Sequence, residues 1–103
     1  MSKFVFVYHG GNADASTASP DEIMAAWGAW FGSLGAAIID GGNPTGQAKT
    51  VGAHGAVDGG GSNPITGYSL IDAPSLAAAA ALAAGCPVLK SGGTVEVAET
   101  FDM

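Results

Sequence analysis

The chain contains no arginine and only three lysines against nine acidic side chains, a formal net charge of −6 over 103 residues. Nucleic-acid binding needs a basic surface opposite the phosphates, so this balance argues against a nucleic-acid partner. It also disfavours an anionic membrane surface. An anionic ligand would have to rely on Lys3, Lys49, Lys90, backbone N–H groups or helix N-termini.

A single cysteine, Cys86, cannot form a disulfide within the chain, which fits a reducing compartment. The longest apolar helical stretch, residues 76–84, is far shorter than a membrane span. The run Met1–Val7 lacks the long apolar region of a signal peptide and is predicted to be a strand. We therefore expect a cytoplasmic protein with no membrane partner, and a single domain over residues 1–103.

Short apolar runs, helix-start signals and glycine clusters predict an α+β fold. Strands are predicted at residues 4–8, 36–40, 48–53, 65–71 and 94–97, and helices at residues 19–34 and 75–84. The strand at 48–53 is expected to form a hairpin with 36–40, and the glycine-rich segment 54–64 is expected to be a loop. Without one short strand, this order is the ferredoxin-like split βαβ plan, with two helices on one face of the sheet.

The first predicted helix has a clear start. Ser19 is a typical N-cap, Pro20 suits the first helical position, and Glu22 completes a capping box. The large apolar side chains of this helix recur at near-helical spacing and predict one stripe that packs on the sheet. The stripe consists of Ile23, Trp27, Trp30, Phe31 and Leu34.

The first predicted strand is apolar on both faces, because Phe4, Phe6 and Tyr8 alternate with Val5 and Val7. A strand that is covered on one face alone should alternate apolar and polar residues. Helices can cover one face of the sheet, and in so small a chain a second copy is the obvious cover for the other. We therefore predict a homodimer formed by two sheets packed face to face.

Several segments together resemble the YCII-related proteins, in particular their DGPF-like branch, over roughly residues 3–99. The resemblance is carried by Tyr8, Ser19–Glu22, Trp27–Phe31, Gly67–Ile71, Gly85–Pro87 and Gly92–Val97. It implies a ferredoxin-like α+β fold that dimerises as an α/β barrel. A few members of this family are dehalogenating or lactone-processing enzymes of aromatic degradation.

The resemblance also identifies where this chain departs from the family. Some YCII proteins carry a His on the first helix and an Asp just before the Pro after the second helix, proposed as a catalytic pair. The helix position falls near Met24, and Cys86 stands where that Asp would be, so the His-Asp mechanism does not transfer to this chain. The DGPF stretch is altered as well, to Asp58-Gly59-Gly60-Gly61.

Candidate catalytic residues are His9 and Asp40, which end the first and second predicted strands beside glycine-rich turns. Histidine can act as an acid or a base near neutral pH, and a nearby carboxylate would orient the imidazole. We predict that the two side chains lie on the order of 6 Å apart, within one water-bridged contact, and line a common apolar cleft. The alternative is a surface His and a turn-capping Asp.

Candidate ligand-binding residues are Tyr68, Trp27 and Asn43, which could place ring surface and an amide in the same cleft. Their alternative roles are core packing for the two rings and stabilisation of the Gly-Gly-Asn-Pro turn for Asn43. His54 and Asp58 offer too few donors for a metal site, and no cofactor motif is present. Cys86 follows a helix C-terminus, which disfavours a thiolate, and is predicted to be a small buried residue.

Two functions follow from this pattern. The first is a small dimeric enzyme that carries out acid–base chemistry on a cyclic or aromatic metabolite. The second is a non-catalytic module that binds a small ligand or serves another protein.

Overall fold

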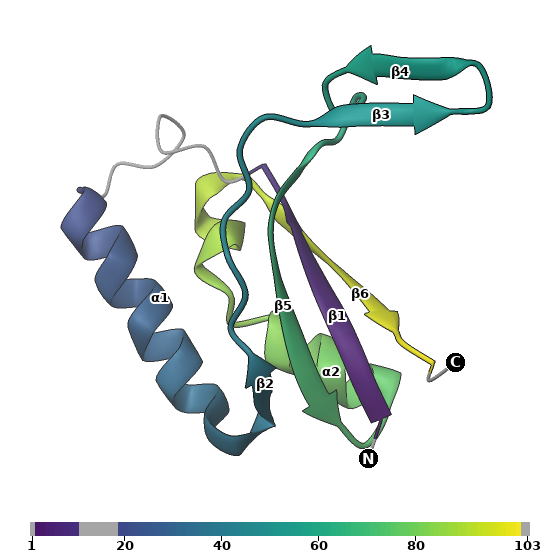
Figure 1. The fold of residues 1–103 in the computed structure, drawn as a ribbon. Helices are drawn as coiled ribbons and strands as arrows, with labels where there is room; N and C mark the ends of the chain where they lie inside the picture. Colours follow the sequence, from purple (N-terminus) through teal and green to yellow (C-terminus); the bar gives the residue numbers. More distant parts are fainter. Residues whose placement is uncertain (1, 11–18, 102–103) are drawn as a thin grey trace.

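The computed structural model describes residues 2–10 and 19–101, so most of the polar loop predicted over residues 10–18 and the last two residues lie outside the described part. The helices and strands in chain order are β1 (Ser2–His9), α1 (Pro20–Leu34), the 3-10 turn η2 (Gly35–Ala37), β2 (Ile38–Asp40), β3 (Lys49–Gly52), β4 (Gly55–Asp58), β5 (Ile65–Ala73), α2 (Leu76–Ala83), the 3-10 helix η3 (Pro87–Ser91) and β6 (Thr94–Glu99). The predicted α+β class is confirmed (Figure 1).

The main sheet has four antiparallel strands in the order β2-β5-β1-β6. The central pair, β1 and β5, runs from Ser2 opposite Ala73 to His9 opposite Ile65, with a bulge between Tyr8 and His9. The long central pairing fixes which side chains share a face, because alternate residues point to opposite sides of a strand.

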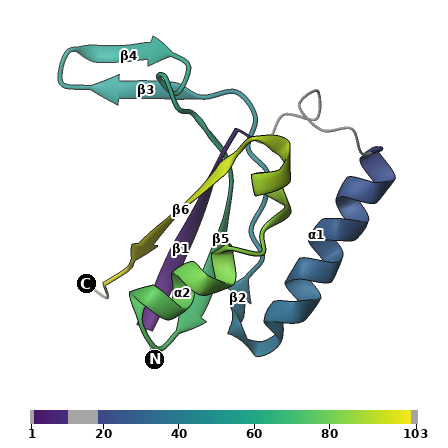
Figure 2. The same cartoon turned by 180° about the vertical axis from the view of Figure 1, so that it is seen from behind.

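One face of the sheet carries the core. Phe4 and Phe6 of β1 and Ile71 of β5 are almost fully buried there. Trp30 of α1 and Ala79 of α2 are buried in the same cluster, so both helices pack on this face. Figure 2 shows this side, with α2 crossing in front of the sheet and α1 beside it.

The other face, called here the open face, is covered by no helix or strand among the described residues (Figure 1). Its centre is formed by Val5, Val7, Leu70 and Ala98, which are all partly exposed. The sheet therefore has apolar side chains on both faces, as its first strand predicts.

The predicted N-cap Ser19 and the predicted end at Gly35 are confirmed, although Glu22 bonds the Ser19 hydroxyl and not its backbone N–H as in a capping box. The Ser19 hydroxyl accepts a hydrogen bond from the backbone N–H of Glu22 and donates one to the Glu22 carboxylate. The helix stops at Gly35, whose φ of 55° lies in the region that favours glycine. Ser75 caps α2 in the same manner by accepting from the N–H of Ala78.

The hairpin prediction for residues 48–53 is wrong. β3 pairs with β4 and not with β2, so part of the predicted loop 54–64 is a strand. Ala53 and His54 form a two-residue turn between Gly52 and Gly55, and Lys49 bonds Asp58 at 2.7 Å across the pair. Figure 1 shows this hairpin projecting beyond the end of the main sheet.

The segment that links β2 to the hairpin continues the edge of the main sheet. The N–H of Tyr68 donates to the Asn43 carbonyl at 3.3 Å, and the N–H of Thr45 donates to the Thr66 carbonyl at 3.0 Å. Gly42 makes this approach possible, because its φ is 73° and a Cβ there would overlap the Tyr68 carbonyl oxygen. Residues 41–45 are called the edge segment below.

No helix within the described ranges is long and apolar enough to cross a membrane.

Candidate functional site

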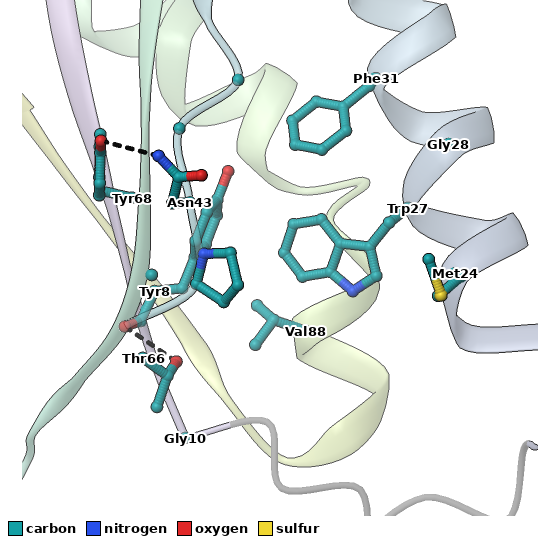
Figure 3. Close-up of a pocket in the computed structure, with 14 residues that line it drawn as sticks. Tyr8, Gly10, Met24, Trp27, Gly28, Phe31, Asn43, Thr66, Tyr68 and Val88 are labelled. Carbon is teal, nitrogen blue, oxygen red and sulfur yellow. Dashed lines mark hydrogen bonds between the residues drawn. The ribbon is translucent and has the colours of Figure 1, made fainter. Parts of the chain in front are cut away.

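A cleft of about 510 Å³ lies between α1 and the edge segment. Its volume falls within the range that is typical of small-molecule sites. Figure 3 shows Trp27 and Phe31 projecting from α1 toward Tyr8 and Asn43 on the opposite side. The lining residues are Tyr8, Gly10, Met24, Trp27, Gly28, Phe31, Gly41, Gly42, Asn43, Pro44, Thr66, Gly67, Tyr68 and Val88.

The helix wall of the cleft comes from Met24, Trp27, Gly28 and Phe31. Trp27, Gly28 and Phe31 follow Met24 by three, four and seven residues, which places all four on one face of α1. The predicted apolar stripe therefore divides into two parts. Trp30, only 6% exposed, packs into the core, whereas Trp27 and Phe31 are half-buried and border the cleft.

The rings are arranged as a connected aromatic cluster. Tyr8 and Trp27 meet edge to face with centroids 5.0 Å apart and an interplanar angle of 83°. Trp27 also lies 5.7 Å from Trp30 and 5.8 Å from Phe31, so its ring is held from several sides. Such contacts favour a particular ring orientation, and they add to the free energy gained by burying the apolar area of the rings.

Tyr8 presents its ring to the cleft, because its hydroxyl is used elsewhere. Ser69 Oγ donates to the Gly41 carbonyl at 2.7 Å, so the Tyr8 hydroxyl, also at 2.7 Å, donates to Ser69. Burial raises the pKa of Tyr8 to about 12. The phenol therefore stays neutral and ties the cleft floor to the edge segment.

Asn43 and Tyr68 border the cleft at the edge segment. The side-chain amide of Asn43 donates to the Tyr68 hydroxyl at 3.3 Å (Figure 3). Tyr68 pairs with Val7, so its ring lies on the opposite side of β5 from Tyr8. The Asn43 amide oxygen accepts no hydrogen bond from a described residue, and the Trp27 indole N–H donates none to one.

This lining limits the chemistry of the cleft. Among the lining residues that the structure describes, none is an Asp, Glu, His, Lys or Cys. A charged ligand would lose hydration without gaining an ionic partner from these residues. The described part of the cleft thus suits an uncharged molecule with ring surface and a small number of hydrogen-bonding groups.

The predicted pairing of His9 with Asp40 is wrong. His9 Nε2 lies 3.0 Å from Glu96 Oε1, and its Nδ1 lies 2.9 Å from the Asn63 carbonyl oxygen. Asp40 pairs with Leu70, which is opposite Val5, so His9 lies four residues further along β1, roughly 13 Å. β5 separates the two strands, and neither residue lines the cleft.

Asp40 instead has the alternative role considered from the sequence. Its Oδ1 accepts a hydrogen bond from the N–H of Gly42 at 2.8 Å, two residues on. This is a turn-stabilising contact of the kind that Asp commonly makes.

The three predicted ligand-binding residues, in contrast, lie together. Trp27, Asn43 and Tyr68 all line the one cleft.

Cys86 is buried, as predicted, with 2% of its surface exposed. Burial raises the pKa of its thiol to about 11, although a hydrogen bond with the backbone of Val88 opposes the shift. The raised pKa of this thiol thus follows from its burial more than from its position after the end of α2.

Within the described ranges, no three His, Cys, Asp or Glu side chains lie close enough to hold a metal ion.

Tyr8 and Gly28 line the cleft without having been predicted to do so. The alternation of Phe4, Phe6 and Tyr8 with Val5 and Val7 carries the signal that Tyr8 shares the face of the two phenylalanines. Gly28 sits between Met24 and Phe31 in the helical repeat, so the repeat itself could have indicated a gap in the apolar stripe. Val88 carried no usable signal, because it lies between the predicted helix 75–84 and the predicted strand 94–97, in a segment without a helix or strand pattern.

No family model matches this chain, and no curated protein matches it. Membership of the YCII-related family therefore stays a prediction.

Proposed function

We propose that this protein binds a small uncharged cyclic or aromatic molecule in the cleft and does so without acid–base catalysis. The observation that carries this proposal is the composition of the described cleft wall, which joins aromatic rings and glycines with no ionisable group that titrates near neutral pH. Trp27 and Tyr8 supply ring surface, while Asn43 and the Trp27 indole N–H supply one acceptor and one donor.

The resemblance to YCII-related proteins supports the same conclusion. Met24, at the position of the family's helix His, borders the cleft and has 74% of its surface exposed. Cys86, at the position of the family's Asp, is buried with a raised pKa. If the resemblance holds, neither position carries a group that transfers a proton near neutral pH, and of the two only Met24 lines the cleft.

The enzyme hypothesis loses its main support for a geometric reason. His9, its proposed acid or base, stands between the cleft residues Tyr8 and Gly10 in the chain, but its ring bonds Glu96 and the carbonyl of Asn63 and does not line the cleft. A general base must reach the proton that it removes. An activity near neutral pH that disappears in His9→Asn would favour the enzyme after all.

Binding can be tested by calorimetry with 2-naphthol, which is uncharged at pH 7, and with 2-naphthoate, which has a similar shape and a negative charge. We expect 2-naphthol to bind and 2-naphthoate to bind at least about tenfold more weakly, because the charge must be desolvated. Trp27→Ala should abolish binding. Leu89→Ala, at an exposed position outside the cleft, is the matched control.

Equal binding of the two probes would overturn the uncharged class of ligand. No binding of either probe would overturn the cleft as a site for small aromatic molecules.

We also propose that the fold is ferredoxin-like and that the protein forms a dimer. The order β2-β5-β1-β6, with α1 between β1 and β2 and α2 between β5 and β6, supports a ferredoxin-like sheet with the β3–β4 hairpin as an insertion. The open face then packs on a second copy in a dimeric α/β barrel. Around its apolar centre, Lys3 lies opposite Asp72 on the neighbouring strand, and His9 Nε2 lies 3.0 Å from Glu96 Oε1.

Sedimentation at micromolar concentration tests the dimer. The wild type should sediment as a dimer, whereas Val7→Lys should yield a monomer, because a buried lysine without a partner is costly. Val51→Lys on the hairpin, where 77% of the side chain is exposed, is the control and should leave the dimer intact. A stable wild-type monomer would contradict this part of the proposal without affecting the cleft.

A further inference from the structure

The wall that α1 contributes to the cleft has a notch at its centre. Met24, Trp27 and Phe31 surround Gly28 on the same helix face (Figure 3). Apart from its chain neighbours Trp27 and Ala29 and the backbone of α1, a Cβ built on Gly28 would meet no atom within 4 Å. The notch is therefore open space bordered by two aromatic rings and a methionine.

The packing of the chain does not require a glycine at this position. Gly42 and Gly67, on the opposite wall, are different, because a Cβ at either position would meet neighbouring backbone atoms. Gly28 lies inside a 15-residue helix, where glycine is less favourable than alanine. The missing side chain thus leaves room for something that is not part of the chain.

We propose that Gly28 is the specificity-determining position of the cleft, and that its notch receives one flat ring of an uncharged ligand with two or three fused rings. This inference rests on the proposed function. A flat ring can lie against the helix backbone at Gly28 between Trp27 and Phe31, because glycine allows the closest approach to a backbone. A bulky saturated ring of the same size is too thick for that position.

The opposite wall fits the same class of ligand. Gly67 is buried in the cleft floor next to the Tyr8 ring, with a Cβ position only 3.3 Å from that ring. The Tyr8 ring and the Gly67 backbone therefore present a surface without a protruding side chain. A planar ligand can contact both walls at once, and its polar substituent can reach the Asn43 amide oxygen or the Trp27 N–H.

The experiment compares Gly28→Ala with Gly32→Ala, using 2-naphthol and decahydro-2-naphthol as probes. Gly32 is on the same helix and also has nothing within 4 Å of its Cβ position, but it does not line the cleft. Both variants should melt at a higher temperature than the wild type, because alanine favours the helix. Only Gly28→Ala should weaken 2-naphthol binding, by about tenfold or more, as one added methyl group does in a fitted site.

The wild type should also prefer 2-naphthol to its saturated counterpart by at least about tenfold. Equal binding of 2-naphthol by wild type and Gly28→Ala would overturn this inference and leave the proposed function standing. Equal weakening by both substitutions would overturn it as well, because the effect would then belong to the helix and not to the notch. If the wild type binds neither probe, the proposed function fails first and this inference falls with it.

Discussion

His9 and Glu96 face each other across neighbouring strands, with Nε2 of the imidazole 3.0 Å from Oε1 of the carboxylate. The other ring nitrogen, Nδ1, faces the carbonyl oxygens of Asn63 and Pro64 at 2.9 Å and 3.3 Å. His9 thereby joins β1, β6 and the segment that returns from the hairpin.

A double-mutant cycle can measure this contact. We expect His9→Gln and Glu96→Gln to be coupled by about 0.2–1 kcal/mol in the free energy of unfolding, a modest value because the Glu96 side chain is 66% exposed. The cycle of His9→Gln with Asp40→Asn should give no coupling beyond about 0.3–0.5 kcal/mol, the usual limit for separate sites. Coupling to Asp40 that equals or exceeds coupling to Glu96 would contradict the geometry described here.

The two tryptophans should differ in their contributions to stability. Trp30 is 6% exposed, and its indole N–H donates to the Leu82 carbonyl at 3.1 Å, so Trp30→Ala should cost roughly 3–5 kcal/mol. Trp27→Ala should cost clearly less, because Trp27 is half-buried at the cleft. Urea unfolding of both variants tests this order, and a larger loss for Trp27→Ala would show that the helix is turned differently.

Local signals allowed most of the fold to be predicted. The Ser19 cap, Gly35 and the apolar repeat between them defined α1, and runs of β-branched and aromatic residues located the central strands. β4 was missed because its residues, Gly55–Asp58, lie in a glycine-rich stretch and form a strand only by pairing with β3. Cross-strand pairing of this kind is not encoded in a short window of sequence.

The candidate site, like the fold, could be predicted from the sequence only in part. Trp27, Asn43 and Tyr68 were expected near one cleft because rings and an amide suit ligand binding, and the fold brings them together. The pairing of His9 with Asp40 required the strand order and register, which place β5 between β1 and β2. The notch at Gly28 exists only because α1 turns one of its faces toward the edge segment. Neither feature follows from residue types alone.

Gly42 should be the glycine of the edge segment that least tolerates substitution. Its φ is 73°, and an added Cβ would overlap the Tyr68 carbonyl oxygen, so Gly42→Ala must displace the edge segment from β5. We expect a loss of at least about 2 kcal/mol in unfolding free energy, together with weaker binding in the cleft. Gly46→Ala is the control and should change stability by no more than about 0.5 kcal/mol, because nothing lies near its Cβ position. Equal effects of the two substitutions would mean that the edge segment is not held against the sheet.

Alkaline pH should destabilise the protein through Cys86 and Tyr8. Burial raises the Cys86 pKa from 9.0 to about 11 and the Tyr8 pKa from 10.0 to about 12. The unfolded chain therefore releases these protons at lower pH than the folded chain does, and stability must fall as pH rises from about 9 to about 12. Both contributions are fully present below pH 9, where the groups are neutral in both states.

Urea midpoints measured from pH 7 to 11.5 test this dependence. Cys86→Ala should flatten the decline that begins near pH 9, and Tyr8→Phe should flatten the part above pH 10, although each variant begins from a lower stability at pH 7. The informative quantity is the slope against pH and not the starting value, because each substitution also removes packing or the hydrogen bond to Ser69. A slope that neither substitution changes would show that the two groups are solvated in the folded protein, and the burial described for Cys86 and Tyr8 would then be incorrect.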